Sequence, residues 1–161
     1  MTPSKLSAVT ALLLAAAGIA AAEPNDVGYP QGYRLWAHVK TASIDPGSPA
    51  FPHFGGLHHI YANKAAMSGY VSGKFPAGSV LVFDVLEWKA GAGATQTGAR
   101  RILDVMEKDP KRFAAAGGWG FTEFKGDSHT ERSIGPDNPA PACAACHATA
   151  KRDGVFSDVA P

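Results

Sequence analysis

Charged residues and cysteines are scarce in this chain of 161 residues. Lysine, arginine, aspartate and glutamate make up 18% of it and leave a formal net charge of +1. So weak a field does not gather nucleic acid or an anionic membrane surface, and we expect no nucleic-acid partner. The length suits one domain with its own hydrophobic core.

Long apolar runs are absent beyond the first residues of the chain. Lys5 precedes an apolar stretch over residues 8–17, and Ala20, Ala21 and Ala22 form a small-residue cleavage pattern. The apolar stretch is shorter than the ~20 residues that a membrane-spanning helix needs. We therefore expect a signal peptide over residues 1–22 and a mature domain over residues 23–161. That domain should reside in the periplasm, with no membrane association after cleavage.

Strand and helix patterns follow one another without regular alternation in the mature chain. Apolar and polar residues predict strands over residues 33–40, 56–61, 79–88 and 118–125. Helices are expected after Asn63 (Ala66, Met67, Tyr70 and Val71 inward), after Thr97 (Ile102, Leu103 and Met106 inward) and from Pro110. Loops are expected over residues 46–52, 91–98 and 126–141. This irregular order indicates a single α+β domain.

The two cysteines belong to one short motif near the C-terminal end. Cys143, Cys146 and His147 form CxxCH, the pattern that attaches a c-type haem. Two thiols on one helical turn reach both vinyl groups of a porphyrin, and the adjacent imidazole then lies against the iron. A thioredoxin-like redox pair is the competing interpretation, but it favours an early position in a βαβ unit. We therefore expect one covalent haem c per chain, with His147 as the axial metal ligand.

The second axial ligand of the iron is not fixed by any motif. A small electron carrier with His and Met ligands places its Met downstream of CxxCH, and no Met occurs between His147 and Pro161. The upstream candidates are Met67, Met106, His38, His53, His58, His59 and His129. Each also fits a purely structural role, the methionines in the core and the histidines as hydrogen-bonding or surface residues. We favour an open sixth site, which permits gas binding or peroxide-type chemistry.

Several short motifs resemble the cytochrome P-460 superfamily over most of the chain from Tyr33 onward. They are Tyr-Ala-Asn at 61–63, Gly-Lys-Phe-Pro-Ala-Gly at 73–78, Lys-Arg-Phe at 111–113, Gly-Trp-Gly-Phe at 118–121, CxxCH at 143–147 and Asp-Gly-Val-Phe at 153–156. This superfamily includes the hydroxylamine-oxidising cytochrome P-460 and the cytochromes c prime beta. The resemblance implies a mostly antiparallel β-sheet with flanking helices, a homodimer, and a five-coordinate haem with His147 on its proximal side.

One strand position separates the two branches of this superfamily. Cytochrome P-460 carries a lysine there that cross-links to the porphyrin, and this chain has Phe83. Phe83 and Phe54 resemble the phenylalanine pair that caps the distal face in cytochrome c prime beta, although both also suit a core. A pocket arginine of the hydroxylamine oxidisers aligns with His58, and their distal carboxylate falls near Asp104. The resemblance thus points to the cytochrome c prime beta branch and places Phe54, Phe83 and His58 beside the haem.

Three functions remain open on the sequence alone. Two phenylalanines over the iron would give an apolar pocket, which suits nitric oxide or carbon monoxide for scavenging, sensing or transport. The alternative is an enzyme that oxidises hydroxylamine or nitric oxide, with Asp104 or His58 moving protons. A third is an electron-transfer cytochrome with a periplasmic partner. Lys151 and Arg152 suit either steering of a ligand or partner, or a solvated helix end.

Overall fold

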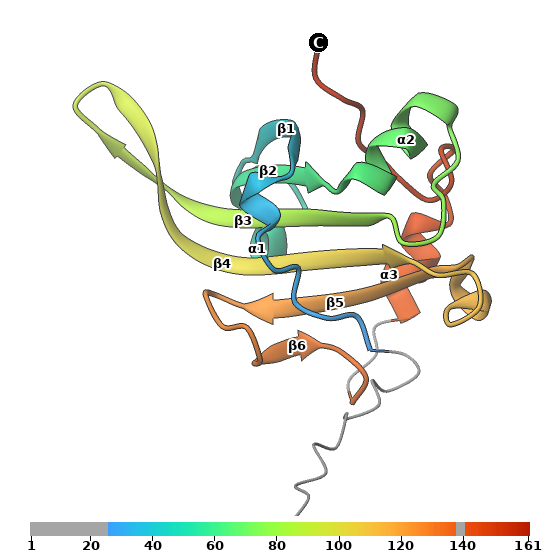
Figure 1. Ribbon diagram of the computed structural model, residues 1–161. Helices are drawn as coiled ribbons and strands as arrows, with labels where there is room; N and C mark the ends of the chain where they lie inside the picture. Colours follow the sequence, from blue (N-terminus) through green and yellow to red (C-terminus); the bar gives the residue numbers. More distant parts are fainter. Residues whose placement is uncertain (1–25, 138–140) are drawn as a thin grey trace, which may run out of the picture.

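An antiparallel sheet of six strands forms the centre of the computed structural model, which describes residues 26–137 and 141–161 (Figure 1). Each strand pairs with its neighbours in the order of the sequence. The strands are β1 (Ala37–Ile44), β2 (Gly56–Ala62), β3 (Val80–Gly91), β4 (Ala94–Lys108), β5 (Trp119–Lys125) and β6 (Arg132–Ile134). This confirms the expected single-domain α+β class with a mostly antiparallel sheet. The predicted signal peptide over residues 1–22 lies outside the described residues.

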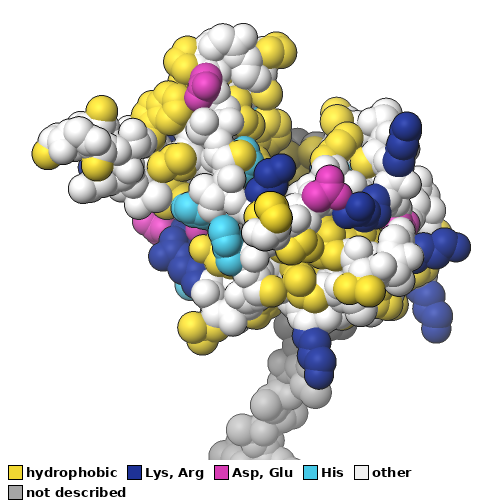
Figure 2. Space-filling view, turned by 90° about the horizontal axis from the view of Figure 1, so that it is seen from above, with side chains coloured by type: hydrophobic (Ala, Val, Ile, Leu, Met, Phe, Trp, Pro, Cys, Tyr) yellow, Lys and Arg dark blue, Asp and Glu magenta, His cyan; other side chains and the backbone are white. Residues whose placement is uncertain are grey.

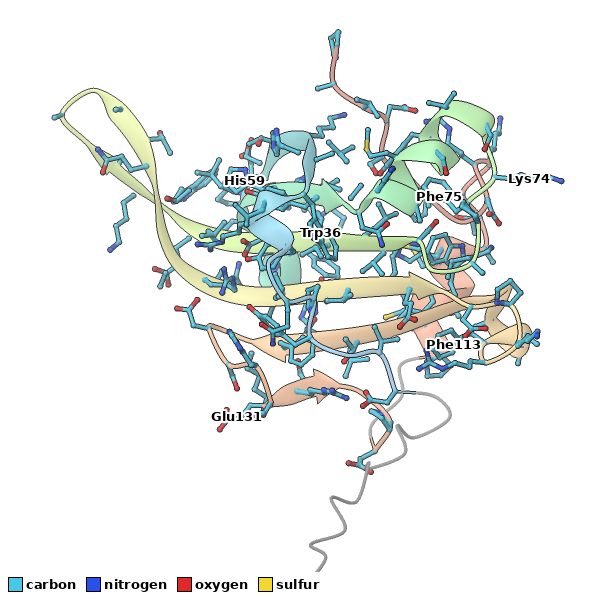
Figure 3. All side chains as sticks on the ribbon, viewed as in Figure 1. Trp36, His59, Lys74, Phe75, Phe113 and Glu131 are labelled. Atoms are coloured by element: carbon cyan, nitrogen blue, oxygen red, sulfur yellow. The ribbon has the colours of Figure 1, made fainter. Side chains whose placement is uncertain are left out.

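The two faces of the sheet bury separate hydrophobic cores. We call them the α3 face, after helix α3 (Pro141–His147) behind the sheet in Figure 1, and the η1 face, after the short 3-10 helix η1 (Tyr33–Leu35) in front. The α3-face core contains Val39, Ala62, Ala66, Tyr70, Phe75, Leu81, Met106, Trp119 and Val155. The η1-face core contains Val27, Tyr33, Val82, Leu103, Val105, Phe113 and Phe124. Figure 3 labels Phe75 from the first core and Phe113 from the second.

The strong strand signal over residues 79–88 is confirmed as β3, which lies between β2 and β4. Its apolar residues occupy both faces because both faces are covered, and Val82 and Val85 are fully buried. Strands β2 and β5 also lie where the alternation predicted them. Figure 1 shows the β3–β4 hairpin extending beyond the other strands, and Trp88 on this hairpin is 36% exposed.

The helix expected after Thr97 is wrong, because this segment is strand β4. It pairs with β3 along its length, from Gly91 opposite Ala94 to Val80 opposite Glu107. The expected loop over residues 91–98 is likewise wrong, since Ala92 and Gly93 make the hairpin turn with positive φ and β4 follows directly. A strand with apolar residues on both faces loses its two-residue period, so the spacing resembled that of a helix.

Other short segments also differ from expectation. Residues 33–35 form η1 instead of a strand, because the Tyr33 hydroxyl donates to the buried Asp84 carboxylate at 2.6 Å and this contact overrides the alternation. Helix α1 (Phe51–Phe54) begins inside the expected loop 46–52, and β6 lies inside the expected loop 126–141. After Pro110 the chain makes a turn and the 3-10 helix η2 (Ala114–Ala116), where we expected a short α-helix.

Helix α2 (Lys64–Ser72) confirms the helix expected after Asn63. The Asn63 side chain accepts hydrogen bonds from the backbone N–H of Ala66 at 2.8 Å and of Val80 at 3.1 Å. It also donates to the carbonyl of Gly78 at 2.8 Å. Asn63 therefore caps the helix and joins it to the start of β3. The inward position expected for Val71 is wrong, because this side chain is 90% exposed.

The helices in the described parts of the chain, residues 26–137 and 141–161, are all too short or too polar to cross a membrane.

Replacing the helix cap should measurably destabilise the fold. We expect Asn63→Ala to lower the free energy of unfolding by about 1–2 kcal/mol, because three backbone groups lose their partner. Denaturant unfolding followed by circular dichroism measures this. Lys64→Ala, at the exposed next residue, should change the value by less than about 0.5 kcal/mol. Equal stability of Asn63→Ala and the wild type would contradict the capping role.

Candidate haem site

Helix α3 presents both cysteines and His147 on one short segment against β5. Pro141 begins the helix, where its fixed φ is favourable, and His147 is the last residue. Residues three and four apart share a side of a helix, so Cys143 lies beside both Cys146 and His147. Both thiols are free; Cys143 is partly buried and Cys146 is exposed. The segment thus offers two thiols and one imidazole to the same ligand.

The imidazole of His147 is held by the turn that follows. Its Nδ1 lies 2.7 Å from the carbonyl oxygen of Gly154. Because a carbonyl only accepts, Nδ1 carries the proton and Nε2 keeps its lone pair for a metal. The rings of Phe121 and Phe156 lie 5.0 Å and 5.3 Å from the imidazole, measured between centroids. An imidazole held in this orientation, with Nε2 available, is suited to bind a metal, as predicted for His147.

The turn that holds His147 is itself bound to the sheet. Asp153 and Gly154 both adopt positive φ, at 47° and 81°. The Asp153 carboxylate accepts from the backbone N–H of Phe75 at 2.9 Å and from the Lys108 ammonium at 2.8 Å. The Asp153 carbonyl accepts from the Trp119 indole N–H at 2.7 Å. The position of His147 therefore depends on groups from the turn before β3, from β4 and from β5.

The structure brings Phe54, Phe83 and His58 together on the α3 face. Phe54 and Phe83 meet edge to face, with centroids 5.9 Å apart and planes at 85°. The His58 ring lies 4.5 Å from that of Phe83. On β3, Phe83 is paired between Ile60 of β2 and Asp104 of β4. The three residues that the sequence assigned to the cofactor thus form one group, and their role as a distal cap stays a prediction.

His58 carries an orphaned polar atom. The residue is 8% exposed, and its Nδ1 is buried without a hydrogen-bond partner among the described residues. Burial, followed by the charges of His59 and Lys40, lowers the pKa of His58, so its ring is neutral. A buried polar atom without a partner costs about 1–3 kcal/mol, which a bound ligand with a polar edge would offset. This residue, together with the thiols and His147, fits a haem on this face.

A cluster of polar side chains around Asp104 and Glu123 also lies on the α3 face, and the sequence predicted only part of it. Asp104 and Glu123 lie opposite each other on β4 and β5, and the charge of Glu123 contributes to the raised pKa of Asp104. His53 Nε2 lies 2.6 Å from Glu123 Oε2, and the Ser133 hydroxyl donates to Oε1. The sequence pointed to Asp104 and gave His53 only as a possible iron ligand. An acid inside an apolar strand was the available signal for Glu123.

The remaining ligand candidates divide between the two faces. His38 and His59 contact Tyr61, and His129 stacks on Tyr29 at 3.8 Å; both tyrosines pack on the η1-face core. Figure 3 shows His59 near the base of the β3–β4 hairpin, away from α3, and Figure 2 shows histidines at the surface beside this hairpin. Met67 and Met106 pack with the α3-face core, as core methionines do.

The environment of Cys143 differs from that of a redox-active thiol. Burial, and then the charges of Asp104 and Glu123, raise the pKa of Cys143, whereas attacking thiols of redox pairs have a lowered pKa. The motif also follows β6 of an antiparallel sheet, not a strand of a βαβ unit. Both observations favour haem attachment.

The two basic residues beyond the motif lie outside the helix. Helix α3 ends at His147, so Lys151 lies in an exposed turn and not at a helix end. Arg152 forms an ion pair with Asp158 at 2.5 Å. The helical placement expected for both residues is wrong, and steering of a ligand or partner by them stays a prediction.

Comparison with protein families agrees with the geometry. The family model for cytochrome P460 matches residues 30–157, which is most of the chain. The search of curated proteins found no match to this chain. The matched region includes the CxxCH helix, Phe54, His58, Phe83 and the Asp153–Gly154 turn. The chain belongs to the cytochrome P460 family and is a haem-binding cytochrome.

Proposed function

We propose that this cytochrome is a periplasmic monohaem protein that binds nitric oxide or carbon monoxide at an iron held by His147 alone. The observation that carries the proposal is the Phe54–Phe83 pair on the α3 face, beside the buried ring of His58. Phe83 occupies the strand position where the resemblance to the hydroxylamine oxidisers would require a lysine. An aromatic cap in place of that lysine favours a gas-binding protein of the cytochrome c prime beta branch.

The thiols would attach the cofactor covalently, and the imidazole would bind its metal. Cys143 and Cys146 would form thioether bonds to the two vinyl groups, giving one haem c per chain. His147 would bind the metal through Nε2, while its Nδ1–H stays on the Gly154 carbonyl. Bound there, the haem supplies an iron atom that binds and exchanges small ligands.

The residues above the site make a pocket that carries little charge. Burial of the Asp104 carboxyl and the nearby charge of Glu123 raise the pKa of Asp104 well above its usual value, which favours its uncharged form. His58 is neutral because its pKa is lowered. The phenylalanine rings displace water and offer no hydrogen-bond donor. Nitric oxide and carbon monoxide are uncharged and need little polar support, whereas dioxygen gains most from a donor.

Oxidation of hydroxylamine or nitric oxide is the second candidate function. It is favoured by the carboxyl pair of Asp104 and Glu123, since Asp104 neighbours Phe83 and could accept a proton from a substrate. The absence of a lysine at Phe83 argues against it. Electron transfer to a periplasmic partner is the third candidate, and an open iron is less suited to it because ligand exchange adds reorganisation.

We propose a homodimer, joined in part through the β3–β4 hairpin. This hairpin extends beyond the other strands, and its Trp88 is a large apolar side chain that remains 36% exposed (Figure 1). Aromatic side chains are enriched in protein interfaces. The resemblance to dimeric family members and the export pattern over residues 1–22 support this assembly and the periplasmic location.

Haem attachment should depend on both thiols. The wild-type protein should retain haem stain on a denaturing gel, because thioether bonds survive denaturation. The double variant Cys143→Ala, Cys146→Ala should lose the stain, while Ser157→Ala should keep it. Stain that persists in the double variant would contradict the attachment.

Removing the Phe83 ring should open the distal pocket. Phe83→Ala leaves a cavity large enough for water, so the ferric protein should become six-coordinate and nitric oxide should associate about tenfold faster. Resonance Raman spectroscopy and stopped-flow measurements report these changes. Leu35→Ala, at an apolar side chain of η1 that is 93% exposed, is the control. Unchanged coordination and kinetics in Phe83→Ala would overturn the capping role.

Hydroxylamine turnover should distinguish the two leading functions. We expect the wild type, supplied with an artificial electron acceptor, to oxidise hydroxylamine near the background rate, because the cross-linking lysine is missing. Steady-state assays of acceptor reduction measure this. Catalytic turnover that falls on Asp104→Asn substitution would favour the enzyme and remove support from the gas-binding proposal.

A further inference from the structure

A chain of three titratable side chains crosses from solvent to the α3 face. It begins at His53 on α1, whose side chain is 51% exposed. His53 Nε2 lies 2.6 Å from Oε2 of Glu123, whose side chain is 2% exposed. Glu123 in turn lies opposite Asp104 in the β4–β5 register, and its charge acts on the Asp104 carboxyl. An exposed imidazole is therefore connected to the buried Glu123 carboxyl, which lies beside the partly buried Asp104.

The Asp104 carboxyl is the member of this pair that is suited to hold a proton. Its raised pKa arises from burial of its carboxyl, then from the charge of the neighbouring Glu123. Two adjacent carboxyl groups ionise separately, because the first negative charge opposes the second. Glu123 already accepts hydrogen bonds from His53 and from Ser133, which stabilise its anionic form. The raised pKa of Asp104 therefore favours its protonated form, next to a Glu123 carboxyl that is hydrogen bonded to His53 and Ser133.

The inner end of this chain faces the haem site. Asp104 is the β4 partner of Phe83, and the charges of Asp104 and Glu123 reach the thiol of Cys143. On the same face, Nδ1 of His58 is buried without a hydrogen-bond partner among the described residues, and its ring lies against Phe83. This orphaned nitrogen indicates that a polar ligand belongs here, independently of the carboxyl pair.

Other charged groups border the chain without replacing its links. On β4, Arg101 donates to the carbonyl oxygens of Gly55 and Pro52, which holds α1 against the sheet. Lys125, two residues beyond Glu123 on β5, is exposed. His58 of β2 is neutral, and the Cys143 thiol on α3 would be consumed by attachment. Of the two side chains that hydrogen bond to the Glu123 carboxyl, His53 and Ser133, His53 is the one with a titratable ring and an exposed side chain.

We propose that His53, Glu123 and Asp104 form a proton relay that couples the oxidation state of the haem site to proton exchange with solvent. The proposal rests on the haem site described above. Asp104 releases its proton when positive charge increases on the α3 face and regains one when that charge decreases. Glu123 passes the proton between Asp104 and His53, and His53 exchanges it with water. Each transfer moves one proton and no electron, and all three residues return to their starting states.

The equilibrium test is the pH dependence of the reduction potential. In the holoprotein we expect the potential to fall as pH rises, by up to about 59 mV for each tenfold change in proton concentration. Glu123→Gln and Asp104→Asn should each reduce this slope at least twofold, because each removes one carboxyl of the pair. Asp127→Asn should keep the wild-type slope, since Asp127 is 83% exposed and pairs with Arg100. Redox titration from pH 5 to pH 9 measures these slopes.

The kinetic test isolates His53. His53→Gln leaves the carboxyl pair intact, so the equilibrium slope should persist while proton uptake after rapid photoreduction slows about tenfold. A pH-indicator dye in stopped-flow or flash-photolysis measurements follows this uptake. Added imidazole should restore the rate, because it replaces the missing side chain. Because His53 is half exposed, His53→Gln should fold. It therefore still tests the relay if Glu123→Gln or Asp104→Asn fails to fold.

Distinct outcomes separate the relay from the proposed haem site. A wild-type potential independent of pH, or a full slope in both carboxyl variants, would overturn the relay even if the haem stain persists. A wild-type rate of proton uptake in His53→Gln would overturn the role of His53. Loss of covalent haem from the wild type would instead overturn the proposed function.

Discussion

The Asp153–Gly154 turn is the constraint on which the rest of the site depends. His147 is the last residue of a short helix, and α3 alone would leave its ring free to rotate. The Gly154 carbonyl removes this freedom by accepting the Nδ1 proton. Asp153 accepts an indole N–H, an ammonium and a backbone N–H from three separate parts of the sheet layer. Docking of the C-terminal segment against the sheet therefore also orients the His147 ring.

The register of the sheet fixes the opposite side of the site. Ile60, Phe83, Asp104 and Glu123 form one row across β2, β3, β4 and β5. A slip of one residue in any strand would move its member of the row to the η1 face. That face is closed by Tyr33, Arg100 and the fully buried Asp84, whose carboxylate accepts from Tyr33 and from Arg100 at 2.6 Å each. This cluster ties β3, β4 and η1 together and stabilises the same register.

Local patterns predicted the parts of the fold that depend on neighbouring residues. Cys143, Cys146 and His147 belong to one five-residue motif, Asn63 precedes its own helix, and β3 carries apolar residues on both faces. Strand β4 was missed because its apolar residues serve both faces, and only its pairing with β3 distinguishes it from a helix. His53 and Glu123 lie 70 residues apart, and their contact exists only once α1 packs on the sheet. Sequence spacing carries no signal for such a pair.

An uncharged pocket and a nearby proton relay are compatible, because they act on different properties of the iron. In the proposed site the phenylalanine rings would control which molecules reach the metal, and uncharged gases would pass such a barrier with the least loss of solvation. Glu123 lies one strand further from Phe83 than Asp104 does. Its carboxyl therefore acts on the site through electrostatics and not through direct contact. A proton that enters or leaves the pair reduces or restores this effect. The family resemblance places a carboxylate near Asp104 in the hydroxylamine oxidisers, where the substrate itself loses protons. With Phe83 in place of the lysine, the same carboxyl would serve the charge balance of the cofactor instead of the chemistry of a substrate.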